Sequence, residues 1–268
     1  MNKYPKISIV TPSFNQGKYI EQTILSVINQ GYPNLEYIII DGGSTDETIS
    51  IVKKYEQYIT YWVSEPDKGQ SDAINKGLAK CTGEIFNWLN SDDWYPEGTL
   101  LAVAEAFNSR PGVRFVSGYE NHIEEGKPTV LHKGTYLKNT LPETIELCEM
   151  AQPSTFVKLA DIKKVGGVSN ELHYIMDGEL WVKLLLQFGQ EGFLKLERIL
   201  VNFRLHAQSK TVSNAVVDNF LLERSSIIYH LQSFLGLPNF VKDFYLNDIF
   251  GTKNIKQLHT YWQINEQI

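Results

Sequence analysis

The sequence predicts an α/β protein with a mostly parallel central sheet, flanking helices and further helices at its C-terminal end. Short apolar segments alternate with segments of helical periodicity through residues 1–110, which is the pattern of repeated strand-and-helix units. The apolar segments at 35–40 and 85–89 are continuous rather than alternating, as in strands that are covered on both faces. Polar or acidic residues follow these strands directly, so we expect a binding site at one edge of the sheet.

The first two strand-and-helix units can be placed from local signals. Residues 7–10 form the first predicted strand, and a helix follows because mostly apolar residues recur at helical spacing: Tyr19, Ile20, Thr23, Ile24, Val27 and Ile28. Residues 35–40 form the second strand. Ser44 and Glu47 then have the spacing of a capping box, which predicts the start of the second helix.

The next two strands end in the same way. Residues 60–64 form the third predicted strand, and Ser71 begins the helix that follows it. The fourth strand, at 85–89, leads into the adjacent carboxylates of Asp92 and Asp93. Because parallel strands present their carboxyl ends at one edge, the polar residues after all four strands converge on one crevice: Ser13, Asn15, Asp41, Glu65, Asp67, Asp92 and Asp93.

The pattern changes beyond Pro111. Residues 113–119 predict a strand, 121–127 a polar turn and 129–131 a returning strand, whereas 133–148 has no assignable pattern. This part of the chain therefore does not continue the simple alternation of strands and helices.

Elements of both kinds return further along the chain. Residues 152–157 predict a strand, and an amphipathic helix begins at Met176 with an apolar face: Leu180, Trp181, Leu184, Leu185 and Phe188. Residues 200–204 predict the last strand, and 218–235 and 240–250 predict helices at the C-terminal end.

The adjacent carboxylates of Asp92 and Asp93 need a chemical explanation, because two ionised carboxylates side by side repel each other. A divalent cation such as magnesium or manganese, which also binds phosphate oxygens, would hold both charges. The alternative is that the two aspartates only cap the turn into the helix after Pro96. The common glycine-rich phosphate loops are missing from the sequence, so a bound nucleotide would need such a cation.

Composition excludes several classes of function. Apolar residues make up 43% and charged residues 21% of the chain, as in a soluble globular protein, and the net charge of -6 argues against a nucleic-acid partner. We expect no signal peptide and no transmembrane segment, since apolar runs stay well short of the roughly 20 residues that a bilayer requires. Cys81 and Cys148 stand apart, which fits a reducing cytoplasm.

Five blocks occur in order within the first hundred residues: Thr11-Pro12-Ser13-Phe14-Asn15, Asp41-Gly42-Gly43-Ser44-Thr45-Asp46, Asp67-Lys68-Gly69-Gln70-Ser71-Asp72-Ala73-Ile74-Asn75-Lys76-Gly77, Thr82-Gly83-Glu84 and Leu89-Asn90-Ser91-Asp92-Asp93. In order and spacing they resemble the family 2 glycosyltransferases with the A-type fold. Weaker similarity follows at three places: Gln152-Pro153-Ser154-Thr155-Phe156, Asp177-Gly178-Glu179-Leu180-Trp181 and Phe203-Arg204-Leu205-His206. The resemblance covers most of residues 5–210.

The resemblance implies a site for a nucleotide-sugar donor at the strand ends. Asp41 would hydrogen-bond the base, most plausibly a uracil or thymine imide, while Asp67 and Lys68 would lie near the base and the phosphates. Three residues would sit beside the nucleoside: Pro12, Ser13 and Asn15. The resemblance therefore implies that residues 1–110 form the nucleotide-sugar-binding half of the domain.

The resemblance also implies the catalytic groups. Asp92 would face the ribose and the sugar, and Asp93 would bind the cation, with His206 as an additional ligand. Asp177 matches the family's general base, although Glu179 stays an alternative, and from local sequence Asp177 fits an N-cap of its helix equally well. Residues 111–212 would then be the acceptor-binding and catalytic half of the same domain, and 213–268 a C-terminal helical extension.

The implied function is a metal-dependent inverting glycosyltransferase. It would use manganese or magnesium to move a sugar from a UDP- or dTDP-sugar to a hydroxyl of a glycan or a lipid-linked acceptor. We expect it to act in cell-surface polysaccharide synthesis in the cytoplasm, at the inner face of the membrane. The terminal helices leave open a peripheral membrane contact or a homodimer.

Two alternatives to this function differ in what the sequence would need. A non-catalytic sugar-nucleotide or glycan-binding protein on the same fold would have lost the base, whereas Asp177 is present. A sugar-phosphate nucleotidylyltransferase would need a glycine-rich loop with a basic residue after the first strand, and residues 13–16 do not provide one.

Overall fold

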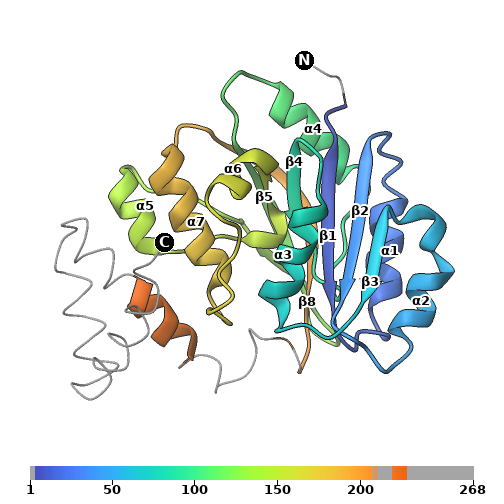
Figure 1. The fold of residues 1–268 in the computed structure, drawn as a ribbon. Coiled ribbons are helices and arrows are strands. Elements are labelled where there is room, and N and C mark those ends of the chain that lie inside the picture. Colours follow the sequence, from blue (N-terminus) through green and yellow to red (C-terminus); the bar gives the residue numbers. More distant parts are fainter. Residues whose placement is uncertain (1–3, 208, 210–218, 228–268) are drawn as a thin grey trace.

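The computed structural model describes residues 4–207, 209 and 219–227, and within them the strands form one eight-stranded sheet (Figure 1). The sheet order is β3-β2-β1-β4-β7-β5-β6, and β8 pairs with β5 outside this path. The strands have these bounds: β1 Ile7–Ser13, β2 Leu35–Asp41, β3 Tyr61–Ser64, β4 Ile85–Trp88, β5 Phe115–Glu124, β6 Val130–His132, β7 Thr155–Lys158 and β8 Phe193–Leu205.

The pairing confirms the predicted fold class, a mostly parallel mixed sheet with flanking helices. Strands β1 to β4 pair in parallel with one another, and β8 is parallel to β5. Antiparallel pairing enters where β7 joins β4 and β5, and where β6 joins β5. The carboxyl ends of β1 to β4 therefore meet at the lower edge of the sheet in Figure 1.

Helices cover both faces of the sheet, which explains the continuous apolar strands. They have these bounds: α1 Ile20–Ile28, α2 Thr48–Lys54, α3 Gln70–Lys80, α4 Thr99–Asn108, α5 Leu141–Leu147, α6 Leu159–Lys164 and α7 Met176–Phe188. Alternate residues of β1 divide between the two faces. Ile9 packs in a cluster with α1, α2 and α4, whereas Val10 packs in a second cluster with α3, α6 and α7.

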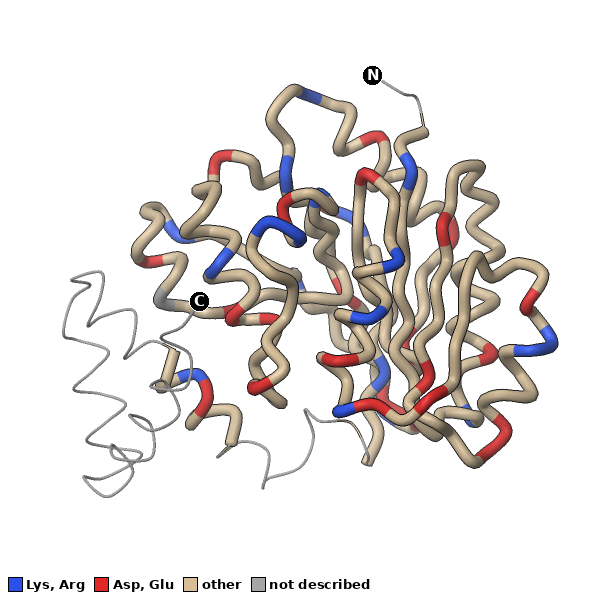
Figure 2. The backbone as a smooth tube through the Cα atoms, viewed as in Figure 1, with Lys and Arg blue, Asp and Glu red and all other residues tan. Residues whose placement is uncertain are grey.

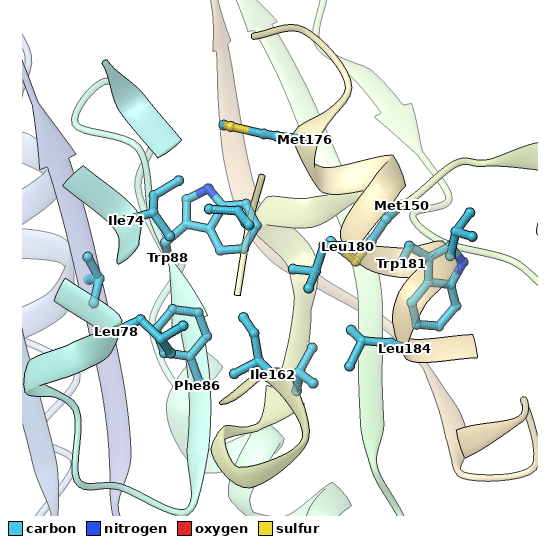
Figure 3. Close-up of a cluster of buried hydrophobic side chains, with 14 of the residues drawn as sticks. Ile74, Leu78, Phe86, Trp88, Met150, Ile162, Met176, Leu180, Trp181 and Leu184 are labelled. Atoms are coloured by element: carbon cyan, nitrogen blue, oxygen red, sulfur yellow. The ribbon is translucent and has the colours of Figure 1, made fainter. Parts of the chain in front are cut away.

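The cluster around α3 and α7 links the two halves of the chain (Figure 3). In the close-up, Ile74 and Leu78 of α3 lie beside the aromatic rings of β4, and α7 contributes a second group: Leu180, Trp181 and Leu184. Trp181 is fully buried, and its ring meets Phe115 of β5 edge-on at 5.2 Å. The first turn of α7 is thereby held against the sheet that carries the other candidate residues.

Glycine at position 77 is required for the close packing of α3 on β1. A Cβ atom added to Gly77 would lie 2.5 Å from Val10 Cγ1, and Val10 is itself fully buried. We expect Gly77→Ala to lower the free energy of unfolding by about 1–3 kcal/mol, because a packed core has no space for another methyl group. Urea denaturation measures this, with Ala79→Ser on the exposed face of the same helix as control. Equal stability of the two variants would show that the contact relaxes freely.

Several elements differ from what the sequence predicted. Residues 121–124 continue β5 rather than form a turn, and the last strand starts at Phe193 rather than at 200. The predicted capping box is absent, since the Ser44 hydroxyl donates to the Asp41 carboxylate and α2 begins only at Thr48. The segment 133–148, which had no assignable pattern, contains α5, and α5 has a capping box of its own between Thr140 and Glu143.

The C-terminal expectations can be compared with the structure only in part. Residues 219–227 are helical, within the predicted helix at 218–235, and the prediction for 240–250 lies outside the described residues. Among the described helices, we find none with both the length and the apolar character that crossing a membrane requires.

Candidate active site

The site is a cavity of about 650 Å³ at the carboxyl ends of the parallel strands. Figure 2 shows acidic residues along this lower edge of the sheet, where the loops after the strands lie. The volume of the cavity is in the range of pockets that hold small molecules and cofactors. Half of the residues predicted for the site line its wall, and they come from both halves of the chain: Pro12, Ser13, Asp67, Asp92 and Asp177.

Asn15 and Asp41 hold the loop behind one wall of this cavity. Asn15 has a left-handed backbone (φ 52°), and its Oδ1 accepts a hydrogen bond from Thr45 N at 2.9 Å. The Asp41 carboxylate is fully buried and accepts hydrogen bonds from the backbone of Gly43 and Ser44 and from the Ser64 hydroxyl at 3.0, 2.8 and 2.7 Å. These contacts fix the loop that brings Gly42 to the cavity wall.

Asp67 lies opposite that loop, and the absence of a side chain at Gly42 makes room for it. A Cβ atom at Gly42 would lie 2.7 Å from Asp67 Oδ2. The other carboxylate oxygen, Oδ1, accepts a hydrogen bond from Gly69 N at 2.8 Å. Lys68, by contrast, is exposed and lies outside the cavity lining, with its backbone N–H donating to Asp72.

The structure brings Asp92, predicted to face the ribose and the sugar, into contact with His206, predicted as a metal ligand. His206 Nε2 lies 2.9 Å from Asp92 Oδ2, although the two residues are far apart in sequence. Their side chains are 21% and 13% exposed, so the pair is accessible at the cavity but largely shielded. The His206 ring also packs on Tyr19 at 4.8 Å, which holds the imidazole in place.

Asp93 lies behind the cavity wall. It is 1% exposed, and its oxygens accept hydrogen bonds from Arg204 N at 2.9 Å and from Asn90 Nδ2 at 3.3 Å. Burial, and then the charge of Asp92, raises the pKa of Asp93 well above its usual value. The two adjacent carboxylates therefore have different surroundings, with Asp92 at the cavity and Asp93 in the interior.

Arg204 supports the acidic pair from β8. Its Nε donates to the Asp92 carbonyl oxygen at 3.0 Å, and its guanidinium lies over the rings of Tyr19 and Trp94 at 4.8 and 4.6 Å. The planar guanidinium suits this double stacking, which a lysine could not reproduce. β8 thus delivers both the support of the acidic pair and His206, which follows one residue after the strand ends.

Asp177 and Glu179 occupy different positions in the first turn of α7. Asp177 lines the cavity, and one of its oxygens accepts a hydrogen bond from Gly178 N at 2.8 Å. Glu179 lies outside the lining residues, its side chain is 17% exposed, and Lys183 pairs with it at 3.0 Å. Burial raises the pKa of Glu179. Of the two candidates for a base, only Asp177 faces the space where a substrate would bind.

The sequence analysis missed several polar residues that shape the cavity. Gln152 lines it, and its Nε2 donates to Asn87 Oδ1 and to the Trp88 carbonyl oxygen at 2.8 and 2.7 Å, which fixes the end of β4. Gln70 also lines it and donates to Asn90 Oδ1 at 2.8 Å. Both belong to blocks quoted above for the resemblance, so the motifs marked these residues without indicating a role.

Glu223, from the helical segment 219–227, holds the loop that precedes α7. Its carboxylate accepts hydrogen bonds from three consecutive backbone N–H groups, of His173, Tyr174 and Ile175, at 3.0, 2.8 and 3.0 Å. His173 and Tyr174 line the cavity. The arrangement places a negative charge at the start of the helix that carries Asp177.

We expect Glu223→Gln to lower the free energy of unfolding by about 2 kcal/mol, because hydrogen bonds to a charged acceptor are stronger than those to an amide. Thermal and urea denaturation measure the change. Glu125→Gln, which removes an exposed carboxylate, serves as the matched control. Equal stability of the two variants would show that the contacts of Glu223 add nothing to the fold.

Comparisons with known proteins agree on one family. The model for Glycosyl transferase family 2 matches residues 8–157. The chain is 34% identical over 132 residues to TuaG of Bacillus subtilis, which is named as a glycosyltransferase of teichuronic acid biosynthesis. That match covers 47% of this chain and 52% of TuaG. The chain spans about half the length of several curated relatives it matches.

Two solved structures share the fold. The structure of Staphylococcus aureus TarS 1–349 in complex with UDP-GlcNAc matches with a TM-score of 0.65 and 18% identity, over 96% of this chain and 79% of that one. The mannosyltransferase PcManGT from Pyrobaculum calidifontis, in complex with GDP-Man and Mn²⁺, matches with a TM-score of 0.58 and 18% identity. That match covers 97% of this chain and 80% of PcManGT. At these identities the likeness establishes the A-type fold.

Proposed function

This chain belongs to glycosyltransferase family 2, and on that premise we propose that it transfers a sugar from a nucleoside-diphosphate donor to a hydroxyl group, with inversion at the anomeric carbon. One observation carries the proposal: a single cavity is lined by Asp67, by Asp92 with His206 beside it, and by Asp177. These residues would bring a donor site, a cation site and a base close together, as an inverting transfer needs.

The donor would lie along the loops after β1, β2 and β3. Pro12, Ser13 and Asp67 line this part of the cavity. Asn15 and Asp41 would shape the nucleoside site through the loop that they hold, and Lys68 would meet the phosphates from the cavity's edge. We propose a uridine or thymidine diphosphate sugar; the TarS complex with UDP-GlcNAc, on the same fold, supports the uridine choice.

The residues beside the donor's diphosphate fit a divalent cation. Asp92 and His206 offer a carboxylate oxygen and an imidazole nitrogen that already lie 2.9 Å apart, a donor set suited to manganese as well as magnesium. When bound, the cation would neutralise the diphosphate and stabilise charge on the leaving group. The PcManGT complex contains Mn²⁺ on the same fold. Asp93, predicted from sequence as the metal ligand, would support this site from behind the cavity wall through its hydrogen bond from Arg204 N.

Asp177 would accept the proton of the acceptor hydroxyl as that oxygen attacks the anomeric carbon. Glu179 forms an ion pair with Lys183, so it would stabilise the helix rather than take part in proton transfer. We propose that the acceptor is a glycan or a lipid-linked molecule. It would bind to residues of the 111–212 half that face the cavity. The similarity to TuaG supports a role in cell-surface polysaccharide synthesis, which would use cytoplasmic nucleotide sugars at the inner face of the membrane.

Calorimetric titration with a panel of nucleoside diphosphates and their common sugars, in manganese and again in chelator, tests the proposal. We expect one uridine or thymidine diphosphate to bind with a clear requirement for the metal. If no member of the panel binds in either condition, a nucleotide-sugar site at this cavity is contradicted. Binding that is equal in chelator would retain the donor site but reject the cation.

A further inference from the structure

Glu120, His122 and His132 form a second cluster of metal-ligating groups, made of other residues than the Asp92 and His206 pair. His122 Nε2 lies 3.0 Å and His132 Nδ1 3.6 Å from the same carboxylate oxygen, Glu120 Oε2. One ligand atom from each of the three residues falls within 4.8 Å of the others. Among the described residues, no other group of three or more histidine, cysteine, aspartate or glutamate side chains has its ligand atoms this close together.

The pairing of β5 with β6 creates the cluster. Glu120 and His122 are two residues apart on β5, so their side chains point to the same face of the strand. His132 on β6 is the direct cross-strand partner of Glu120. The two imidazole rings stack at 5.0 Å with an angle of 19° between their planes. Three side chains from two strands therefore converge because of the strand register, not because of an exposed loop.

The carboxylate in this cluster is unusually buried. Glu120 is 3% exposed, and burial works to raise its pKa, but the contacts with His122, His132 and Ser154 outweigh burial and hold the pKa at about 2. Within the described chain, these two histidines are its ion-pair partners. Its other oxygen, Oε1, is buried and accepts no hydrogen bond there. The Ser154 hydroxyl also lies 3.2 Å from the Ala151 carbonyl oxygen.

The contacts of His132 fit a cation between these groups. Gly134 N donates to His132 Nδ1 at 3.2 Å, so this nitrogen presents a lone pair. With that neutral form the same nitrogen faces the lone pairs of Glu120 Oε2, an arrangement that a bound metal ion would make favourable. Without a metal, a proton on the imidazole does the same, and the contact with Glu120 accordingly raises the pKa of His132. Lys195 carries charge near Glu120, but its Nζ donates to the carbonyl oxygens of Thr135 and Gly118 at 2.9 and 3.3 Å.

The donor set identifies the class of ion. Two imidazoles and one carboxylate are a common set for zinc with an open fourth position, whereas magnesium prefers six oxygen ligands. In a tetrahedral site with bonds of about 2.1 Å, ligand atoms are separated by about 3.4 Å. The observed 3.0 and 3.6 Å lie on either side of that value. We propose that Glu120, His122 and His132 bind one zinc-class transition-metal ion, with His132 exchanging its contact with Gly134 for the metal.

Such an ion would cross-link the edge strand β6 to β5, near the cavity. β6 is three residues long, all of them exposed, and Val130 and Leu131 are exposed apolar side chains at this edge. The His132 side chain is half exposed, which gives an ion a route from solvent. The His122 ring packs on Phe203 at 5.1 Å, and Phe203 lines the cavity. The metal would therefore stabilise both the β5–β6 pair and one wall of the candidate active site.

Zinc titration of the full chain, with excess manganese present to fill the donor-site pair, tests this inference. We expect one equivalent of zinc to bind, and His132→Ala and Glu120→Gln each to weaken zinc at least about 100-fold, since losing even an outer-shell partner costs 10- to 100-fold. Glu124→Gln, further along β5, is the matched control and should bind zinc normally. Substitution with Co²⁺ should give the visible absorption of a tetrahedral site in the unaltered chain and in Glu124→Gln alone.

Melting temperatures separate loss of the metal from loss of the fold. Without metal, His132→Ala should melt close to the unaltered chain, because the residue is half exposed. Zinc should raise the melting temperature of the unaltered chain and of Glu124→Gln, but not that of His132→Ala. The inference is overturned if less than a tenth of an equivalent binds, or if the affinity is the same in all four proteins. None of these measurements uses nucleotide or transfer, so the result is independent of the proposed function.

Discussion

Asp177→Asn is expected to lower the rate of sugar transfer by about 10²- to 10⁴-fold, the usual contribution of a general base. The substitution keeps the size and the hydrogen-bonding shape of the side chain but removes its ability to take a proton. Donor affinity should stay close to that of the unaltered chain, because the proposed base acts on the acceptor hydroxyl and not on the diphosphate. Single-turnover transfer and calorimetric donor binding, measured on the same preparation, check the two halves of this expectation.

Glu179→Gln is the matched comparison, because it removes the neighbouring carboxylate in the same helical turn. The structure pairs Glu179 with Lys183 outside the cavity lining, so its loss should affect melting temperature more than transfer. If Glu179→Gln abolished transfer while Asp177→Asn retained it, the assignment of the base would be reversed. Loss of donor binding in Asp177→Asn would instead place this aspartate in the donor site.

Asp92→Asn is expected to remove the part of donor binding that depends on metal. Its carboxylate faces the cavity and contacts His206 at 2.9 Å, and an amide oxygen is a much weaker ligand for a divalent cation. We expect donor affinity in manganese to fall about 100-fold, to the level that the unaltered chain shows in chelator. His206→Ala should give a smaller fall in the same direction. Calorimetry in the two conditions measures both.

Asp93→Asn decides which of the adjacent aspartates binds the cation. Burial raises the pKa of Asp93, so its charged form is costly in the fold, and asparagine should be tolerated without loss of stability. If Asp92 is the ligand, this variant keeps most of its metal-dependent binding. Complete loss of metal dependence in Asp93→Asn, with Asp92→Asn unaffected, would restore the expectation drawn from the sequence.

The sequence was sufficient for features that depend on neighbouring residues. Local patterns and the geometry of parallel strands predicted the strand ends, the amphipathic face of α7 and the placement of Asp67 and Asp92 at one edge. Asp177 was assigned to the site only by the resemblance to the family. The sequence did not predict α5, because a short helix of mixed composition has little hydrophobic periodicity. Its capping box, Thr140 with Glu143, was the signal that could have shown it.

Features that depend on distant residues could not be predicted in this way. Which of Asp92 and Asp93 faces the cavity is settled by Arg204, whose backbone N–H binds the inner carboxylate from another strand. His122 and His132 looked like unremarkable single histidines, because their shared partner Glu120 is recognised only when the register of β5 and β6 is known. Cross-strand register is not written in the local sequence.

Crystals grown with manganese and the nucleoside diphosphate selected by calorimetry allow the most direct test of the donor site. An anomalous difference map should show one manganese peak between the diphosphate oxygens and the pair formed by Asp92 and His206, with the base beside Pro12 and Asp67. A nucleotide bound outside this cavity, or one bound within it without a metal peak at that pair, would contradict the account.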